Sequence, residues 1–116
     1  MAKVIGRGLR RVDAPDKATG KALYAGDYSA ENMLHACLVR SEYAHAELIN
    51  IDTSALPKDV FCFSAKDVVK NAIPFIFEDQ PAFADKKVRF FGEPIAVVAA
   101  DTYEAALAAS SHLRYH

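Results

Sequence analysis

The stretch that decides the fold is residues 88–100, which read VRFFGEPIAVVAA. Its second part, residues 95–100, is an unbroken run of small and β-branched apolar residues, and such a run predicts a buried strand. The Gly-Glu-Pro sequence at 92–94 marks a turn before that strand. Residues 88–91 are β-prone and are expected to form a further strand.

A helix is predicted immediately after this run. Asp101 or Thr102 is expected to cap its N-terminus, where Glu104 would lie beside the positive end of the helix dipole. Its expected apolar stripe consists of Tyr103, Ala106, Leu107 and Leu113. The last residues, 113–116, resemble the start of another strand.

More strands are expected on the N-terminal side of the stretch, at residues 22–25, 33–40, 46–51 and 60–63. Residues 33–40 are apolar on both faces of an alternating pattern, and residues 60–63 are apolar throughout. Both segments are therefore predicted to be covered on both sides. Five or six strands with two or three short helices predict an α+β (mixed α/β) domain.

The connecting segments carry their own signals. Residues 52–57 predict a turn or a short helical element with a polar start. Ser64 and Asp67 have the spacing of a capping box, which predicts a short helix through Val69. Residues 71–87 contain two prolines and predict a loop, which the aromatic residues Phe75, Phe77 and Phe83 would anchor.

The first 21 residues differ from the rest because they are rich in Gly, Arg, Asp and Pro and poor in apolar periodicity. We expect an extended N-terminal arm at 1–21 and a domain at 22–116. The basic residues of the arm are Lys3, Arg7, Arg10, Arg11, Lys17 and Lys21, against the acidic Asp13 and Asp16. An arm of this kind favours packing on a partner domain; the alternative is a stand-alone binding module that uses the basic arm.

Composition narrows the class of protein. The chain has 116 residues, of which 52% are hydrophobic and 25% charged, and these values fit one globular domain. Its net charge of −1 gives no general attraction to nucleic acid or to an anionic membrane. The sequence has no apolar run of the ~18 residues that span a membrane and no signal peptide at its start, so we expect a cytoplasmic protein.

The sequence offers no catalytic, cofactor-binding or metal-binding residue that we would name. Gly6 and Gly8 follow no strand and open no helix, so they do not form a dinucleotide fingerprint. Cys37 and Cys62 are expected to be buried free thiols. Cys37 and His35 could be drawn as a nucleophile and its base, but no third group orients them. The four histidines, His35, His45, His112 and His116, show no metal-ligand spacing.

Several short motifs, taken in their order along the chain, carry a family resemblance. They are residues 11–27 (RVDAPDKATGKALYAGD), 33–36 (MLHA), 39–41 (VRS), 44–46 (AHA), 49–54 (INIDTS), 65–68 (AKDV) and 88–99 (VRFFGEPIAVVA), followed by the alanine-rich helix. This series resembles the start of the molybdenum-binding subunit of the xanthine dehydrogenase and aldehyde oxidase family, the molybdenum hydroxylases. Lys58 departs from that pattern, because the family often has a glycine in this turn.

The resemblance implies an α/β hammerhead domain that is a truncated fragment of a longer subunit. Such a parent enzyme oxidises purines, other N-heterocycles or aldehydes with a water-derived oxygen. It would use molybdopterin-bound molybdenum, 2Fe-2S clusters and FAD, on the same chain or on partner subunits. The resemblance implies that this segment alone is not catalytic and holds no cofactor. Its partners would be the molybdenum-binding domain and the iron–sulfur and FAD domains, and neither nucleic acid nor a membrane.

Overall fold

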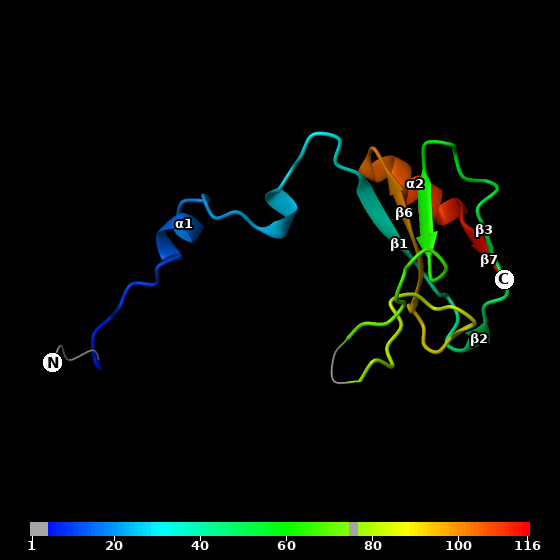
Figure 1. Ribbon diagram of the computed structural model, residues 1–116. Helices are drawn as coiled ribbons and strands as arrows, with labels where there is room; N and C mark the ends of the chain where they lie inside the picture. The colour runs from blue at the N-terminus through cyan, green and yellow to red at the C-terminus, as the bar shows by residue number, and fades with distance from the viewer. Residues whose placement is uncertain (1–4, 75–76) are drawn as a thin grey trace. The chain divides into compact units, whose positions relative to one another are not determined.

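The computed structural model describes residues 5–74 and 77–116, which divide into two compact units, Met1–Glu31 and Asn32–His116. Figure 1 shows the course of the chain. Two residues singled out in the sequence, Lys3 of the arm and Phe75 of the loop, lie outside the described residues. No helix among the described residues is long and apolar enough to cross a membrane.

The first unit contains one short helix, α1 (Ala14–Ala18), and one 3₁₀ turn, η1 (Ala25–Asp27). Asp13 precedes α1 and forms ion pairs with Arg11 and Lys17, at 2.8 and 2.7 Å. Hydrogen bonds from Lys17 and then Arg11 lower the pKa of the Asp13 carboxyl group. The described part of the segment at 1–21 is thus helical over one turn, and two of its basic residues, Arg11 and Lys17, are paired within it.

The strand predicted at residues 22–25 is wrong. Tyr24 donates its backbone N–H to the Asp27 carboxylate at 2.8 Å, and Asp27 donates its own N–H to the Tyr24 carbonyl at 2.9 Å. These two bonds close a tight turn. They use backbone groups that a strand would need for a neighbour.

The second unit is built on a three-stranded antiparallel sheet with the order β1-β6-β4. Its strands are β1 (His35–Arg40), β6 (Pro94–Ala100) and β4 (Phe61–Ser64). The strands predicted at 33–40, 60–63 and 95–100 are therefore confirmed, within two residues at their ends. β6 is the central strand, as expected for the most apolar run of the sequence.

A β-bulge interrupts the pairing of β6 with β1. Val39 pairs with Ala96 and Arg40 pairs with Pro94, so Ile95 has no partner on β1. A bulge of this kind lets two consecutive residues point to the same side of a sheet. Accordingly Ile95 and Ala96 are both fully buried. In a regular strand two neighbours point to opposite faces, so both would be buried only if both faces were covered.

Two small ribbons complete the strands. β2 (Ala46–Glu47) pairs with β5 (Lys87–Val88), and β3 (Ile51–Asp52) pairs with β7 (Arg114–Tyr115). The strand predicted at 46–51 is thus split into two, because its ends pair with different partners. The expected strand at 113–116 is present as β7, whereas the one predicted at 88–91 stops at Val88.

The strand at 88–91 is cut short by a turn that a buried carboxylate organises. Glu93 is almost fully buried and accepts the backbone N–H of Arg89, whose guanidinium lies 3.2 Å from the same carboxylate. Glu93 also donates its N–H to the Phe90 carbonyl, and Gly92 adopts a φ of 85°. Such a backbone angle suits glycine and ends the extended conformation.

The predicted helix is α2 (Tyr103–His112), and Thr102 is its cap: the Thr102 hydroxyl accepts the N–H of Ala105 at 3.1 Å. The expected apolar stripe is wrong at two of its four positions, because Tyr103 and Leu107 are about half exposed. The buried residues are instead Ala106, Ala109 and Leu113. Their spacing of three and four residues places them on one face, and the small alanines let the helix approach the sheet closely.

The connecting segments correct one prediction and confirm another. The helix expected after Ser64 is a turn, in which the Asp67 carboxylate accepts the Ser64 N–H at 2.8 Å. The capping pattern is present, but no helix follows it. The described residues of 71–87, which are 71–74 and 77–87, form a loop as predicted, apart from Lys87 in β5 and a bridge between Ile73 and Gln80.

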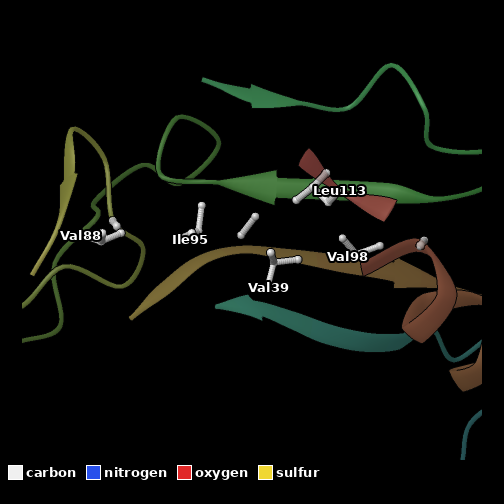
Figure 2. Close-up of a cluster of buried hydrophobic side chains, with 8 residues drawn as sticks. Val39, Val88, Ile95, Val98 and Leu113 are labelled. Atoms are coloured by element: carbon white, nitrogen blue, oxygen red, sulfur yellow. The ribbon is translucent and has the colours of Figure 1, made fainter. Parts of the chain in front are cut away.

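The core joins side chains of the sheet, such as Val39 and Val98, to Ala109 of α2 and to Leu113. Figure 2 shows Val39, Val98 and Leu113 within this cluster. In total, the described residues form seven strands and two α-helices, which confirms an α+β fold of the hammerhead type with more strands than expected. The described residues at 52–57 form a turn rather than a helix.

We predict that Val98→Ala lowers the free energy of unfolding by about 2 kcal/mol, because it removes buried methyl groups and leaves a cavity. Val98 is 0% exposed, whereas Val69 is fully exposed. The same truncation at Val69 should therefore change stability by no more than about 0.5 kcal/mol. Urea unfolding followed by circular dichroism measures both. Equal losses for the two variants would contradict the assignment of the core.

Candidate interaction surface

The residues that could have carried chemistry lie apart from one another. His35 is on β1, His112 ends α2, and His45 and His116 are exposed. The ring of His112 contacts the Ala108 carbonyl through its Nδ1 atom at 2.6 Å. Among the described residues, no three His, Cys, Asp or Glu side chains come together in a group that could hold a metal ion.

The two cysteines lie on the same face of the sheet, one on each side of the central strand. Cys37 of β1 and Cys62 of β4 both pair with Val98 of β6, so two strand spacings, roughly 9–10 Å, separate their backbones. A disulfide needs Cα atoms within about 7 Å. Both thiols are free and only half-buried, although full burial was expected.

Neither cysteine is arranged as a nucleophile. Burial, and then the negative charge of Asp67, raises the pKa of the Cys62 thiol. A reactive cysteine instead needs a lowered pKa and a nearby positive charge. Cys37 shares its face with His35, two residues away on the same strand, as the sequence predicts. The structure records no hydrogen bond between the two side chains.

The surface of residues 32–116 also has several hollows. One of 300 Å³ lies between α2 and the segment before β4, and its only ionisable lining residues are Asp59 and His112. Ligand sites usually occupy 300–1,000 Å³ and converge several polar groups. Two ionisable groups cannot complete a metal site.

The three-stranded sheet has an apolar face that points away from α2 and is partly exposed. We call this surface the outer face. Its residues form two rows across the strands. The first row is Leu38, Val97 and Phe63, and the second is Ala36, Ala99 and Phe61. All six are apolar. Phe61, Phe63 and Leu38 are 50%, 44% and 47% exposed.

The outer face corrects the prediction that residues 33–40 and 60–63 are covered on both sides. Among the described residues, α2 packs on the opposite face of the sheet, against β1 and β6. The two faces of the sheet differ in exposure along β1, since Val39 on the inner face is buried and Leu38 on the outer face is half exposed. The apolar pattern on both faces was the correct signal. The pattern could not show that, among the described residues, α2 covers only one of these two faces.

A second exposed apolar feature is the turn that follows β5. Phe90 and Phe91 are more than half exposed, although Glu93 and Arg40 fix the turn beneath them. Arg40 donates its guanidinium to the Gly92 carbonyl at 2.9 Å. Phe77, which was expected to anchor the loop at 71–87, is also largely exposed.

Comparison with known proteins places this fold. Residues 19–115 match the family model described as aldehyde oxidase and xanthine dehydrogenase, a/b hammerhead domain. The chain is 36% identical, over 86% of its length, to the nicotinate dehydrogenase large molybdopterin subunit of Eubacterium barkeri, of which it covers 24%. It is 39% identical, again over 86% of its length, to the xanthine dehydrogenase/oxidase of Gallus gallus, of which it covers 8%.

Solved structures agree with the sequence matches. The chain superposes on CO dehydrogenase from Oligotropha carboxidovorans with a TM-score of 0.85 and 33% identity, over 96% of this chain and 15% of that one. For the aldehyde oxidoreductase from Desulfovibrio gigas the TM-score is 0.82 and the identity 32%, over 91% and 14% of the two chains. The resemblance seen in the sequence motifs is thereby confirmed: the chain belongs to the aldehyde oxidase and xanthine dehydrogenase family and corresponds to its a/b hammerhead domain.

Proposed function

We propose that the chain serves as a non-catalytic structural domain of a molybdopterin-dependent hydroxylase. The observation that carries the proposal is the match over residues 19–115 to a domain that makes up only 8% to 24% of the first curated relatives. Most of each relative therefore lies outside the matched segment. A reaction centre in that remaining part explains how a family of enzymes can share a domain with no catalytic constellation of its own.

The parent reaction we propose is oxidation of a purine, another N-heterocycle or an aldehyde with a water-derived oxygen. Relatives named for xanthine, nicotinate and an aldehyde as substrates support this range. The described residues do not fit a 2Fe-2S cluster. A 2Fe-2S cluster takes four ligands, usually thiolates, and this chain has two cysteines on separate strands. Molybdopterin-bound molybdenum, 2Fe-2S clusters and FAD would belong to other parts of the enzyme.

The division into an arm at 1–21 and a domain at 22–116 remains our proposal for the chain's organisation. The arm would lie on a partner, since Ile5, Leu9 and Val12 are largely exposed. The molybdenum-binding domain of the same subunit and the iron–sulfur and FAD domains are the proposed partners. We place the enzyme in the cytoplasm, where a reducing environment suits two unpaired thiols.

The test of the proposed function is the coding sequence beyond His116, together with the metal content of the proteins it encodes. We expect several hundred further codons and a full-length protein with stoichiometric molybdenum. The chain 1–116 alone should bind no stoichiometric molybdenum, iron or zinc. A stop codon directly after His116, or stoichiometric molybdenum in the isolated chain, would overturn the proposal.

A catalytic role of β1 is excluded if two substitutions leave turnover intact. In the full-length enzyme, Cys37→Ala and His35→Ala should each keep kcat and KM within about twofold of the wild type. Cys37→Ala should still cost about 1 kcal/mol of stability, because Cys37 points toward the core. Steady-state kinetics and thermal unfolding separate the two effects. A large fall in kcat with an unchanged melting temperature would support a nucleophilic Cys37 instead.

Cys62 should alkylate slowly in the folded protein, because burial and Asp67 raise the pKa of its thiol. In a Cys37→Ser variant, whose only thiol is Cys62, the pH of half-maximal iodoacetamide reaction should lie above that of the urea-unfolded chain. Asp67→Asn should move it back down.

The raised pKa of Cys62 also determines how the stability of the fold depends on pH. A thiol whose pKa is higher in the folded state contributes stability fully below its unfolded pKa, and that contribution is lost as the pH rises through the folded value. An alkylation profile identical in the folded and unfolded chain would contradict this environment for Cys62.

A further inference from the structure

We propose that the outer face is a docking surface for an uncharged, apolar surface on another part of the same polypeptide, outside residues 1–116. The inference rests on the proposed function, because it requires that the domain belongs to a longer chain. It goes further by naming which face of the domain is covered and what kind of surface covers it.

The chemistry of the outer face selects an apolar partner. None of its six residues is ionisable, and two phenylalanines and one leucine dominate the exposed area. The nearest charge along β1 is Arg40, whose guanidinium already donates to the Gly92 carbonyl. Nucleic acid or an acidic peptide would find no free cation among these six residues, and nucleic-acid binding depends on such contacts. A partner surface of aliphatic or aromatic side chains would bind favourably, because docking removes the apolar area of both surfaces from water.

The area of the outer face argues against a second copy as the occupant. A fully exposed large apolar side chain presents about 150–250 Å², so Leu38, Phe61, Phe63 and the adjoining Leu34 expose roughly 350 Å² together. Each partner in a stable dimer buries about 800 Å². The outer face provides less than half of that.

A tethered partner does not need so large an interface. When two surfaces belong to one chain, their effective concentration is in the millimolar range, and most of the entropy of association is already lost. The relatives provide such a tether, because the matched segment is 8% to 24% of their length. Domains within one chain commonly meet over small and partly polar interfaces.

The sheet itself keeps the outer face rigid. β6 holds Val97 and Ala99 between neighbours on both sides, and α2 fixes the opposite face of the same strand. A rigid display of aromatic side chains lowers the entropy lost when a partner docks. Phe61 and Phe63 are therefore the expected anchors of the interface.

The test uses the full-length enzyme with Phe63→p-benzoylphenylalanine, a photo-cross-linking residue of similar shape. After irradiation, we expect mass spectrometry to find cross-links from position 63 to peptides of the same chain outside residues 1–116, with the cross-linked product keeping the mass of one chain. The matched control, Val69→p-benzoylphenylalanine, is fully exposed and off the outer face, and should cross-link far less. Cross-links between two copies, or none at position 63, overturn the proposal.

Hydroxyl-radical footprinting of the unmodified full-length enzyme gives an independent result if the variant does not fold. Phe61 and Phe63 should be oxidised several-fold more slowly than Phe90, which has a similar exposed fraction here but lies off the outer face. Equal rates overturn the proposal.

Molybdenum content of the same preparation separates the two hypotheses. Full molybdenum with an open outer face refutes only the docking surface, whereas a protein without molybdenum refutes the proposed function.

Discussion

The antiparallel pairing of β6 with two neighbours at once is the constraint on which the rest of the domain depends. β6 supplies Ile95, Ala96 and Val98 to the core, and its partners β1 and β4 reach it from segments more than 25 residues away in sequence. Because each neighbour is short, neither would be stable as a separate hairpin. The bulge at Ile95 adds a further buried side chain beside the turn that Glu93 organises. The helix α2 follows β6 directly and closes over the face that this strand offers.

One consequence of this arrangement is an asymmetry between the two faces of the sheet. The inner face is covered by α2, whose alanines permit close packing, while the outer face retains Leu38, Phe61 and Phe63 at about half exposure. A sheet with two apolar faces normally lies between two layers. Within the described residues of 32–116, α2 supplies one of these layers, on the inner face.

The ionisable groups that the structure does engage have local, structural tasks: Asp13 joins two basic side chains, Asp67 closes a turn and Glu93 fixes the segment after β5. Family members named for different substrates share the domain at 31% to 39% identity.

The sequence by itself determined the central strand, the helix that follows it, a loop within residues 71–87 and the family, because each rests on local pattern or on ordered motifs. It left Asp101 and Thr102 open as the cap of that helix, and the structure selects Thr102. Tertiary structure decided the rest. The segment at 46–51 divides between two partners, and the capping pattern at Ser64 closes a turn without a helix. The buried face of α2 keeps the expected Ala106 and Leu113, but it includes Ala109 in place of Tyr103 and Leu107. Periodicity identifies which residues avoid water, but not which neighbour covers them. For that reason the sequence predicts that the residues of the outer face are buried, whereas the structure shows them partly exposed.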